Sequence, residues 1–471
     1  PYLFEMVNIR NQCSWVHADQ PEAATAKAAR LIRAGVSRAL RLEPLSDRTY
    51  AVQSQALVVG GGVAGMSAAL TVADQGYPVH LVEMNSHLGG YARNLTETLE
   101  GESPPRLALQ LAEQVMRHPQ IQVHLDSRLT SHSGHVGAFE GVIRGPGADP
   151  QTLPYGTVIV ATGGRPYEPV EYRHGADPRV MTQVALARRI REDHRWAQNR
   201  RRVVMIQCVG SRNEAFPFCS RVCCSAAVRN ALSLKAANPE VQVVVLYRDL
   251  RTFGFKELYY LEARRKGVLF FRYIPEEAPQ VYEEESGSLV VDFTDRSSHQ
   301  PFRVEPDLVV LSSGIRPGHG AEPLAKLLKL PRGAEGFFME AHVKLRPLDF
   351  ASPGIFLAGL AHSPRFVPEA IAMAKGAAQQ AVKVLSRKQM RVPATVAEVD
   401  PDRCASCLAC VRLCPYDAPF INAEGVSEIP PPKCRGCGIC VSECPARAIT
   451  LKHSTDDQIE SKIDALLEAE L

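Results

Sequence analysis

The C-terminal part of the chain contains two copies of a cysteine pattern that can hold metal. Each copy reads Cys-x-x-Cys-x-x-Cys-x-x-x-Cys-Pro, and the copies begin 30 residues apart. In such a repeat, each short run gives three thiolates to one [4Fe-4S] cubane, and the fourth ligand comes from the other run. The first predicted cluster is held by Cys404, Cys407, Cys410 and Cys444, and the second by Cys434, Cys437, Cys440 and Cys414. A pair of structural zinc sites is the alternative.

A glycine-rich loop near residue 60 has the pattern of a dinucleotide-binding site. Residues 57–59 read as a buried strand, Gly60-x-Gly62-x-x-Gly65 as a tight turn, and residues 66–73 as a helix whose N-terminus faces a pyrophosphate. A second strand at 79–82 ends at Glu83, whose carboxylate can accept from ribose hydroxyls. The predicted cofactor-binding residues are Gly60, Gly62, Val63, Ala64, Gly65, Glu83 and Met84. A glycine-rich surface turn is the alternative.

Three further stretches resemble those of two-dinucleotide flavoproteins. Leu88-Gly89-Gly90 follows the acid closely, residues 158–164 are a strand ending in small residues, and a strand ending at Gly359 precedes a long helix. The resemblance implies FAD rather than NAD, with the nucleotide and flavin close to these stretches. The residues matched on this basis are Gly89, Gly90, Ala161, Thr162, Gly163, Gly359 and Ala370. Ordinary turns, and a strand-turn-helix unit without a ligand, are the alternatives.

A second cysteine group occurs where a related disulfide reductase would bind NADPH. The strand at 203–207 runs into Cys208-Val209-Gly210-Ser211-Arg212 instead of Gly-x-Gly-x-x-Gly, and the next strand, at 241–246, ends at Tyr247-Arg248 rather than at an acid. We infer that phosphate binding has been lost here. Cys208, Cys219, Cys223 and Cys224 can give four soft ligands to one further [4Fe-4S] cluster, and zinc or structural thiols are the alternatives. Lys256, Glu257 and Tyr259, further along, could lie near the flavin, although such residues more often form a solvated helix face.

These motifs define the expected elements and domains. The fold class is α/β, a two-dinucleotide-binding-domain flavoprotein of the thioredoxin-reductase-like kind, followed by a bacterial-type 2[4Fe-4S] ferredoxin α+β domain. A helix is expected at 107–116 and a strand at 121–125. The predicted divisions are an N-terminal helical segment (1–50), the FAD-binding domain in two parts (51–165 and 319–390), the cysteine-bearing second unit (166–318), the ferredoxin domain (391–455) and a C-terminal helix (456–471).

Composition bounds the class of protein. The chain has 471 residues, 45% of them hydrophobic and 22% charged, with a formal net charge of +3, as in ordinary globular proteins of several domains. No basic stripe indicates nucleic acid, and no apolar run is long enough for a membrane-spanning helix. A cytoplasmic location is therefore expected, peripheral to a membrane only through partners. Because the chain begins at Pro1 rather than Met, a segment upstream is expected to have been removed or to lie outside this sequence.

Two terminal features remain open. Cys13 and His17 could share a helical face as ligands, but a buried thiol beside a satisfied histidine is favoured. At the other end, residues 456–471 read as an amphipathic helix with Ile459, Ile463, Leu466 and Leu467 on one face. Packing on its own domain is favoured over docking to a partner.

Taken together, these motifs resemble the family of heterodisulfide reductase A subunits over nearly the whole chain. The most specific match is Gln207-Cys208-Val209-Gly210-Ser211-Arg212 with Cys219, Cys223 and Cys224; the others are the opening from Asn8 to His17, the flavin loop, residues 267–270 and the ferredoxin repeat. The resemblance implies FAD in the core, a cluster beside it, and electron exchange with other subunits. Members in methanogens have their flavin assigned to electron bifurcation. This chain lacks the ferredoxin module that they insert, since residues 91–119 occupy that place and contain no cysteine.

The predicted function is that of an oxidoreductase subunit. FAD and three [4Fe-4S] clusters would pass electrons between iron–sulfur and hydrogenase- or dehydrogenase-type partners, with a homodimeric core inside a hetero-oligomer and bifurcation as a further option. No Cys-x-x-Cys redox pair faces the flavin, so neither a disulfide nor a pyridine nucleotide is an evident direct substrate. The alternatives are an NAD(P)H-dependent reductase like the glutamate synthase small subunit, and a structural adaptor with a vestigial flavin.

Overall fold

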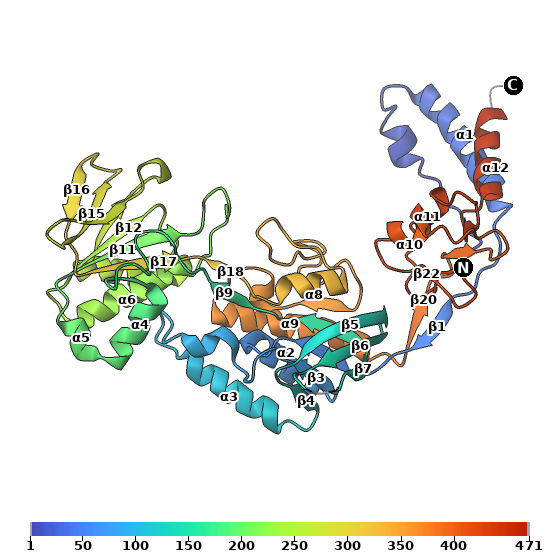
Figure 1. Cartoon of the computed structure of the whole chain (residues 1–471). Helices are drawn as coiled ribbons and strands as arrows, with labels where there is room; N and C mark the ends of the chain where they lie inside the picture. Colours follow the sequence, from blue (N-terminus) through green and yellow to red (C-terminus); the bar gives the residue numbers. More distant parts are fainter. Residues whose placement is uncertain (1, 148, 469–471) are drawn as a thin grey trace. The chain divides into compact units, whose positions relative to one another are not determined.

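The computed structural model describes residues 2–147 and 149–468. The described residues belong to two compact units (Figure 1). Residues 53–387 form what we call the central unit, and residues 1–52 with 388–471 form the terminal unit.

Two five-stranded parallel sheets organise the central unit. Their strand orders are β19-β8-β2-β3-β4 and β10-β17-β11-β12-β13. The first sheet consists of β2 (Ala56–Val59), β3 (Val79–Val82), β4 (Ile121–His124), β8 (Thr157–Val160) and β19 (Ile355–Leu357). The second consists of β10 (Val180–Thr182), β11 (Arg202–Val209), β12 (Gln242–Tyr247), β13 (Leu269–Arg272) and β17 (Leu308–Ser313). Every pair of neighbouring strands within each sheet is parallel.

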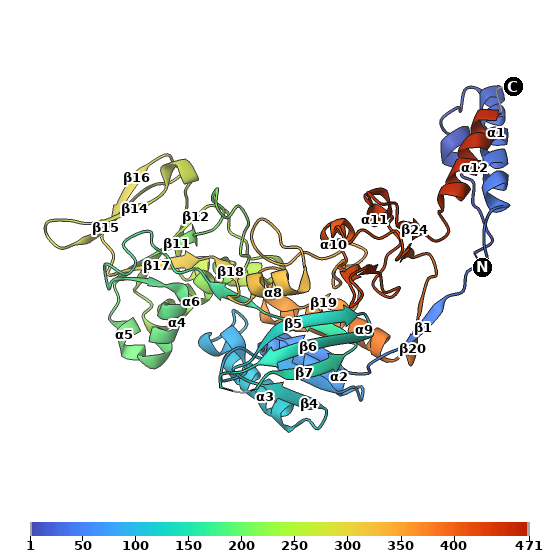
Figure 2. The same ribbon diagram turned by 45° about the vertical axis from the view of Figure 1, so that its right-hand side comes forward.

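The first sheet is the middle layer of three (Figure 2). One face packs on helices α2 (Val63–Ala73), α3 (Pro104–Arg117) and α9 (Val367–Leu385) through buried residues that include Val58, Met66 and Ala374. The other face packs on the antiparallel sheet β5 (Arg128–His135), β6 (Ala138–Arg144) and β7 (Gln151–Tyr155) and on α8 (Ala321–Leu328). Both faces are therefore buried, as the continuous apolar strands require.

The second sheet repeats this arrangement. Helices α4 (Gln183–Glu192), α5 (His194–Gln198), α6 (Cys223–Ala237) and α7 (Glu257–Arg265) cover one face. The antiparallel strands β14 (Gln280–Glu283), β15 (Leu289–Thr294) and β16 (Pro301–Val304) cover the other. The two halves are joined by β9 (Gly164–Pro166) and β18 (Ile315–Pro317), which pair antiparallel. The short helices of the unit are η2 (Gly90–Asn94), η3 (Gly254–Lys256), η4 (Pro275–Glu277) and η5 (Gly359–Ala361).

The terminal unit combines both ends of the chain. Its strands are β1 (Arg48–Ala51), β20 (Gln389–Val392), β21 (Ala397–Val399), β22 (Phe420–Ile421), β23 (Ser427–Glu428) and β24 (Ile449–Leu451). Its helices are η1 (Arg10–Ser14), α1 (Pro21–Ala39), α10 (Ala409–Leu413), α11 (Ile439–Ser442) and α12 (Asp456–Leu467). Three antiparallel pairs, β1 with β20, β21 with β24 and β22 with β23, connect these segments.

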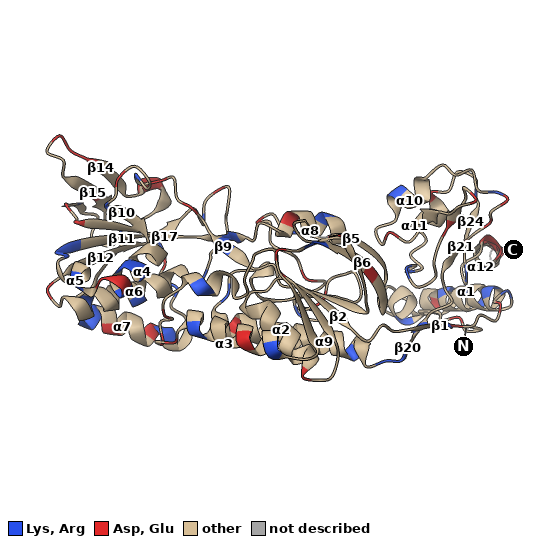
Figure 3. Ribbon diagram, turned by 60° about the horizontal axis from the view of Figure 1, so that its bottom comes forward, with Lys and Arg blue, Asp and Glu red and all other residues tan. Residues whose placement is uncertain are grey.

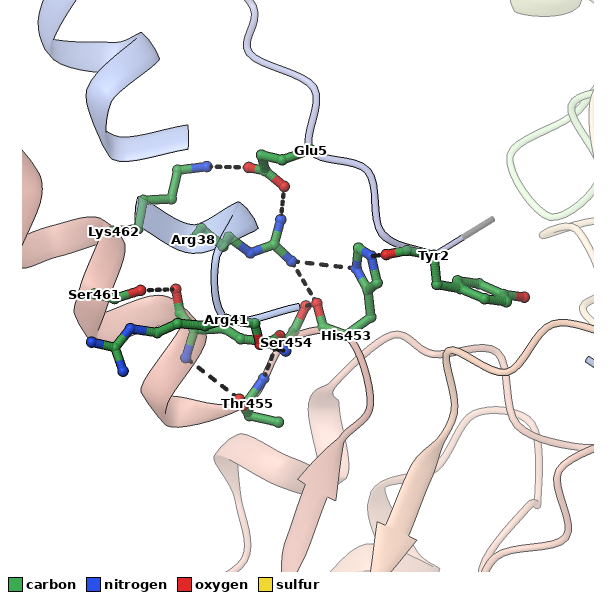
Figure 4. A network of polar contacts seen from close by, with 10 residues as sticks. Tyr2, Glu5, Arg38, Arg41, His453, Ser454, Thr455, Ser461 and Lys462 are labelled. Carbon is green, nitrogen blue, oxygen red and sulfur yellow. Dashed lines mark hydrogen bonds and ion pairs between the residues drawn. The ribbon is translucent and has the colours of Figure 1, made fainter. Parts of the chain in front are cut away.

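A polar network holds the two ends together (Figure 4). The Glu5 carboxylate accepts from Arg38 and also from Lys462, whose Nζ lies 2.8 Å away. The ring of His453 lies 2.9 Å from the Tyr2 carbonyl oxygen, and Gln458 donates to the Arg41 carbonyl oxygen at 3.1 Å. Residues near 2–5 and 453–462 are thus fixed on α1.

The C-terminal helix corrects one prediction. The helix α12 packs against α1, which the sequence assigned to a separate N-terminal segment (1–50) but which lies in the same compact unit. However, the contact uses the small or polar residues Ser461, Ala465 and Gln458, because α1 contributes the equally small Ala34 and Ser37. The apolar side chains Ile459, Ile463 and Leu467 are exposed instead. Residues 469–471 of the predicted helix lie outside the described residues.

The other predicted elements are largely confirmed. The helix expected at 107–116 is α3, the strand at 121–125 is β4, and the motif strands and helices lie within a few residues of the predicted bounds.

Lys and Arg are interspersed with Asp and Glu along the helices (Figure 3). Within the described ranges, no helix combines the length and the apolar character needed to span a bilayer.

Candidate functional site

The glycine loop after β2 has the geometry of a phosphate-binding turn. Gly60 has a φ of +113°, and a Cβ there would lie 2.3 Å from the Ala161 carbonyl oxygen. A Cβ at Gly65 would lie 1.7 Å from the Gly60 carbonyl oxygen, so α2 can approach β2 only without a side chain at that position. The buried Glu83 carboxylate accepts from the Gly61 N–H at 2.6 Å, which fixes the loop against the end of β3.

The predicted flavoprotein stretches surround the same loop. The Gly89 N–H donates to the Gly61 carbonyl oxygen at 2.8 Å, and a Cβ at Gly90 would lie 2.9 Å from the Gly62 Cα. On the opposite side, the Ala161 N–H donates to the Val59 carbonyl oxygen at 2.9 Å. Segments around residues 60, 90 and 161 therefore meet at the carboxyl ends of the parallel strands, where open α/β sheets bind nucleotides.

A cavity of about 1180 Å³ extends from this loop. Of the predicted cofactor residues, those that line it are Gly60, Gly62, Val63, Ala64, Glu83, Met84, Gly89, Gly90, Ala161, Thr162, Gly163 and Ala370. Gly65 and Gly359 are not among its lining residues. Gly65 packs under Gly60, and a Cβ on Gly359 would lie 2.6 Å from the Ala64 Cβ, so both allow close packing of the segments that form the wall.

The cavity wall contains polar groups that fit a bound dinucleotide. The hydroxyls of Thr162 and Ser225 line the cavity, are buried, and have no hydrogen-bond partner in the described protein. Buried hydroxyls are nearly always paired in native proteins, so these two fit a ligand with several hydrogen-bonding groups. FAD fits the glycine loop, the acid and the size of the cavity.

The first turn of α9 closes one side of the cavity. Arg365, Phe366, Val367, Pro368 and Glu369 line it together with Ala370. The Glu369 carboxylate accepts from the Phe366 N–H at 3.0 Å and from the Arg221 guanidinium at 2.8 and 3.1 Å. Burial opposes ionisation of Glu369, but these hydrogen bonds hold its pKa below the ordinary value.

Residues 94–102 form another part of the wall, bridging the two sheets. Glu97 pairs with Arg229 on α6 and Glu100 with Lys256, and all four residues line the cavity. Leu99 is buried in the core of the second sheet, although in sequence it lies between β3 and β4 of the first sheet. Of the two possibilities left open for Lys256, the cavity lining supports proximity to the cofactor site, because the end of η3 faces the cavity.

The four core cysteines form one group at the end of β11. Cys208 begins this group with a φ of +64°, the Arg221 N–H lies 3.3 Å from the Cys219 Sγ, and Cys223 and Cys224 begin α6. Burial, followed by the neighbouring thiols of Cys224, Cys208 and Cys219, raises the pKa of Cys223 well above its ordinary value. The pKa of Cys224 is raised to about 11, again chiefly by burial. Each of the four thiols thus lies within electrostatic range of the others.

Positive charge lies beside this group. Arg212 lies 3.9 Å from the Cys208 Sγ and pairs with Asp249 at 2.6 Å. Arg248, at the position after β12, donates to the Arg212 carbonyl oxygen at 2.6 Å. Because Cys223 also lines the cavity, the cysteine group and the first nucleotide loop open onto the same space.

The ferredoxin cysteines are arranged as the crossed repeat requires. One small cavity is lined by Cys404, Cys407, Cys410 and Cys444, and another by Cys414, Cys434, Cys437 and Cys440. Burial, with Cys434, Cys414 and Cys437 next in importance, raises the pKa of Cys440 to about 11. Backbone N–H groups of Ser427, Ala397, Ala418 and Ala448 point to cysteine sulfurs at 3.3–3.4 Å. Both sets fit a cubane, whose sulfurs accept such hydrogen bonds.

At the N-terminus, Cys13 is buried and His17 is not placed as its co-ligand. The His17 Nε2 atom lies 3.4 Å from Lys27 Nζ, and the His17 backbone N–H donates to the Cys13 carbonyl oxygen at 2.9 Å. Across residues 2–147 and 149–468, no three or more His, Cys, Asp and Glu side chains converge in a way that would hold a single metal ion.

Two family models match the chain at the regions just described. One, described as pyridine nucleotide-disulphide oxidoreductase, matches residues 54–210, and a 4Fe-4S dicluster domain matches residues 397–445. The paired parallel sheets and these two models define the class: a two-dinucleotide-binding-domain oxidoreductase fused to a dicluster iron–sulfur domain. Lactococcus lactis thioredoxin reductase, a solved structure, aligns with 70% of this chain and 99% of its own at 20% identity and a TM-score of 0.49.

Relatives then identify the family. The chain is 33% identical to the iron-sulfur A subunit 1 of the CoB--CoM heterodisulfide reductase of Methanopyrus kandleri, over 99% of this chain and 85% of that protein. It is also 33% identical to the A subunit of the H(2):CoB-CoM heterodisulfide,ferredoxin reductase of Methanothermobacter marburgensis, over 99% and 84%. This chain belongs to the family of heterodisulfide reductase A subunits, as its motifs predicted. It is an oxidoreductase component that carries flavin and iron–sulfur groups.

The alignments also show a difference from these relatives. The alignment with the M. kandleri protein is 568 residues long, so that protein carries residues that this 471-residue chain lacks. Sequence analysis missed several cavity residues, chiefly Arg229, Arg365 and Glu369. Only the helix after Gly359 could have indicated Arg365 and Glu369, because Arg229 reaches the cavity through the packing of the two sheets.

Proposed function

We propose that this chain is the FAD-binding electron-transfer subunit of a heterodisulfide-reductase-like complex, with three [4Fe-4S] clusters. The proposed ligands are the two ferredoxin sets and the core set of Cys208, Cys219, Cys223 and Cys224. One observation carries the proposal: Cys223 lines the same cavity as the Gly60 loop. A cluster held there would adjoin the flavin, where a reductase of this fold would place a pyridine nucleotide.

The chain's own residues have defined roles in this proposal. Bound FAD would exchange electrons both singly and in pairs. The Gly60 loop and the α2 N-terminus would hold the pyrophosphate, and Glu83 the ribose. Arg365 and Lys256 line the cavity and would stabilise negative charge gained on reduction. The wall at 94–102 would exclude water from the space between the two sheets.

Partners would supply and remove the electrons. The names of the relatives describe subunits of heterodisulfide reductases, and by analogy we propose iron–sulfur and hydrogenase- or dehydrogenase-type partners, a homodimeric core and a cytoplasmic location. The name of the M. marburgensis relative pairs a heterodisulfide with ferredoxin. The most specific part of the proposal is that the flavin divides an electron pair between two acceptors. Ferredoxin reduction that occurs only when the second acceptor is present would support that part.

The main test is the ratio of iron to flavin in protein purified without oxygen. Three cubanes give roughly twelve irons per FAD, and two give roughly eight. The lower value would remove the core cluster from the proposal, while absence of flavin would remove the cofactor assignment.

Stopped-flow mixing with NADH and with NADPH is the second test. The loop after β11 has no Gly-x-Gly-x-x-Gly, and Tyr167 packs on Gly210, where a Cβ would lie 2.1 Å from its ring. We therefore expect no bleaching of the flavin by either nucleotide alone, and bleaching once a reduced partner subunit is added. Rapid bleaching by NADPH alone would favour the self-contained reductase.

A further inference from the structure

Arg221 contacts both proposed redox sites. It lies in the loop between Cys219 and Cys223, with a φ of +59°. Its backbone N–H points to the Cys219 Sγ at 3.3 Å, while its guanidinium makes two hydrogen bonds to Glu369, at 2.8 and 3.1 Å. A non-glycine residue in the left-handed region is uncommon and is kept where surrounding contacts require it.

Glu369 is the corresponding residue on the flavin side. It is the third residue of α9, where its carboxylate also accepts from the Phe366 N–H, and it lines the cavity. The two partners come from different halves of the central unit, 148 residues apart. One ion pair therefore joins the loop of the core cysteines to the helix that closes the flavin cavity.

We infer that the Arg221–Glu369 pair is a positioning and charge-balancing link that sets the redox potentials of the flavin and the core cluster together. The inference rests on the proposed function, since it requires both groups to be bound. Neither residue is needed to ligate iron or to exchange electrons; they act through the groups that they hold.

The sign of each residue's effect follows from charge. Reduction adds negative charge at the flavin and at the cluster, so a nearby carboxylate lowers both potentials and a nearby guanidinium raises them. In the intact pair the two effects largely cancel. Removing one partner alone leaves the other uncompensated, and the potentials then shift in opposite directions for the two single variants.

The experiment measures both midpoint potentials in the anaerobically purified full chain. Glu369→Gln is expected to raise them and Arg221→Gln to lower them, each by about three- to tenfold in the equilibrium between oxidised and reduced forms, since the pair is about a third exposed. Tenfold corresponds to about 30 mV for a two-electron couple and about 59 mV for a one-electron couple. The double variant should return close to the original values, and Arg221→Lys should stay close to them.

An ion pair of similar exposure, which also contacts Asp177 and Arg179, provides the control. Arg173 and Glu283 lie 2.9 Å apart, with side-chain exposures of 36% and 39%, against 36% and 37% for Arg221 and Glu369. Neither lines the cavity. Arg173→Gln and Glu283→Gln should leave both potentials unchanged.

The outcomes separate this inference from the proposed function. Iron and flavin are counted first, and missing flavin or roughly eight irons would contradict the proposed function itself. With full cofactor content, shifts of the same sign in both single variants, or no shift in either, would overturn the charge-balancing role. If Arg221→Gln fails to fold, Glu369→Gln and Arg221→Lys still decide the result.

Discussion

Four neighbouring strands follow the same order in the two parallel sheets of the central unit, β8-β2-β3-β4 and β17-β11-β12-β13, but the chemistry at their carboxyl ends differs. After β2, a three-glycine turn leads directly into α2, and Glu83 follows β3. After β11, residues 210–222 separate the strand from α6, and Arg248 follows β12. One strand-loop-helix unit therefore carries the features of a phosphate site, and its counterpart carries four thiols and a basic residue.

The difference shows how a repeated fold can hold two kinds of redox group. The loop after β2 in the first sheet and the loop after β11 in the second each lie at the point where the strand order reverses. Both loops therefore reach the central cavity. A short glycine turn brings backbone N–H groups to a phosphate, whereas a longer loop brings side chains. The topology provides the location, and the loop residues decide what is bound there.

The largest expected effect comes from breaking the thiol group. Cys223→Ser replaces a cysteine that lines the cavity with a poor iron ligand. We expect loss of about four of roughly twelve irons per flavin, with retention of FAD and of the ferredoxin clusters. Iron analysis and EPR of the dithionite-reduced protein measure this.

Ser211→Ala is the control for that variant, because Ser211 is buried in the same loop without a thiol. It should keep its full iron content. Unchanged iron in Cys223→Ser would mean that this cysteine group holds no cluster, and the contrast between the two sheets would reduce to a lost phosphate loop.

A smaller effect is expected at Glu83, the acid that follows β3 in the first sheet. Glu83→Gln keeps the shape of the side chain but removes the negative charge of the group that accepts a hydrogen bond from the Gly61 N–H at 2.6 Å. Loss of a charged hydrogen bond costs about 1.5–3 kcal/mol, which should weaken FAD binding by roughly 10- to 100-fold. Titration of the apoprotein with FAD measures this change in affinity.

The control is Asp249→Asn, after β12, which should leave FAD affinity unchanged. Equal losses of affinity in both variants would show that the two sheet ends are not functionally distinct.

The smallest expected effect is a dependence of stability on pH in the first sheet. The Nδ1 atom of His80 on β3 lies 3.1 Å from the Nε2 atom of His124 on β4, whereas β12 and β13 contain no histidine. Burial, and then the neighbouring His80, lowers the pKa of His124 from 6.5 to about 4, and burial also lowers the pKa of His80.

Above pH 6.5 both histidines are neutral in the folded and the unfolded chain, so they do not lower the free energy of unfolding. Between pH 6.5 and about 4 the unfolded chain binds protons that the folded chain does not, and the free energy of unfolding falls. Because the pair is only half-buried, we expect a loss of about 1–2 kcal/mol.

Urea unfolding at a series of pH values measures this loss. His124→Gln should flatten the decline, while Gln at the exposed His194 should not. An identical decline in all three proteins would assign the acid sensitivity to other groups.

The sequence was sufficient to predict the candidate site wherever its cysteines or glycines are close together in the chain. The ferredoxin repeat predicted which cysteines line each of the two small cavities, with Cys444 in the first and Cys414 in the second, because fixed short spacings leave few ways to form a cubane. The Gly60 loop and Glu83 were predicted for a similar reason, since strand, turn and helix are local features. By contrast, the exposed apolar face of α12 could not be predicted, because α1 lies more than 400 residues away along the chain and selects the face that packs.

Within the central unit, the chain by itself determined the identity of the loops, the strands that precede them and the family to which they belong. Tertiary structure decided which distant residues form ion pairs: Glu97 with Arg229 and Glu100 with Lys256 in the cavity wall, and the cavity residue Glu369 with Arg221. Local spacing carries no information on these pairs, because each joins residues from different halves of a duplicated fold. Only the packing of the two sheets brings them within hydrogen-bonding distance.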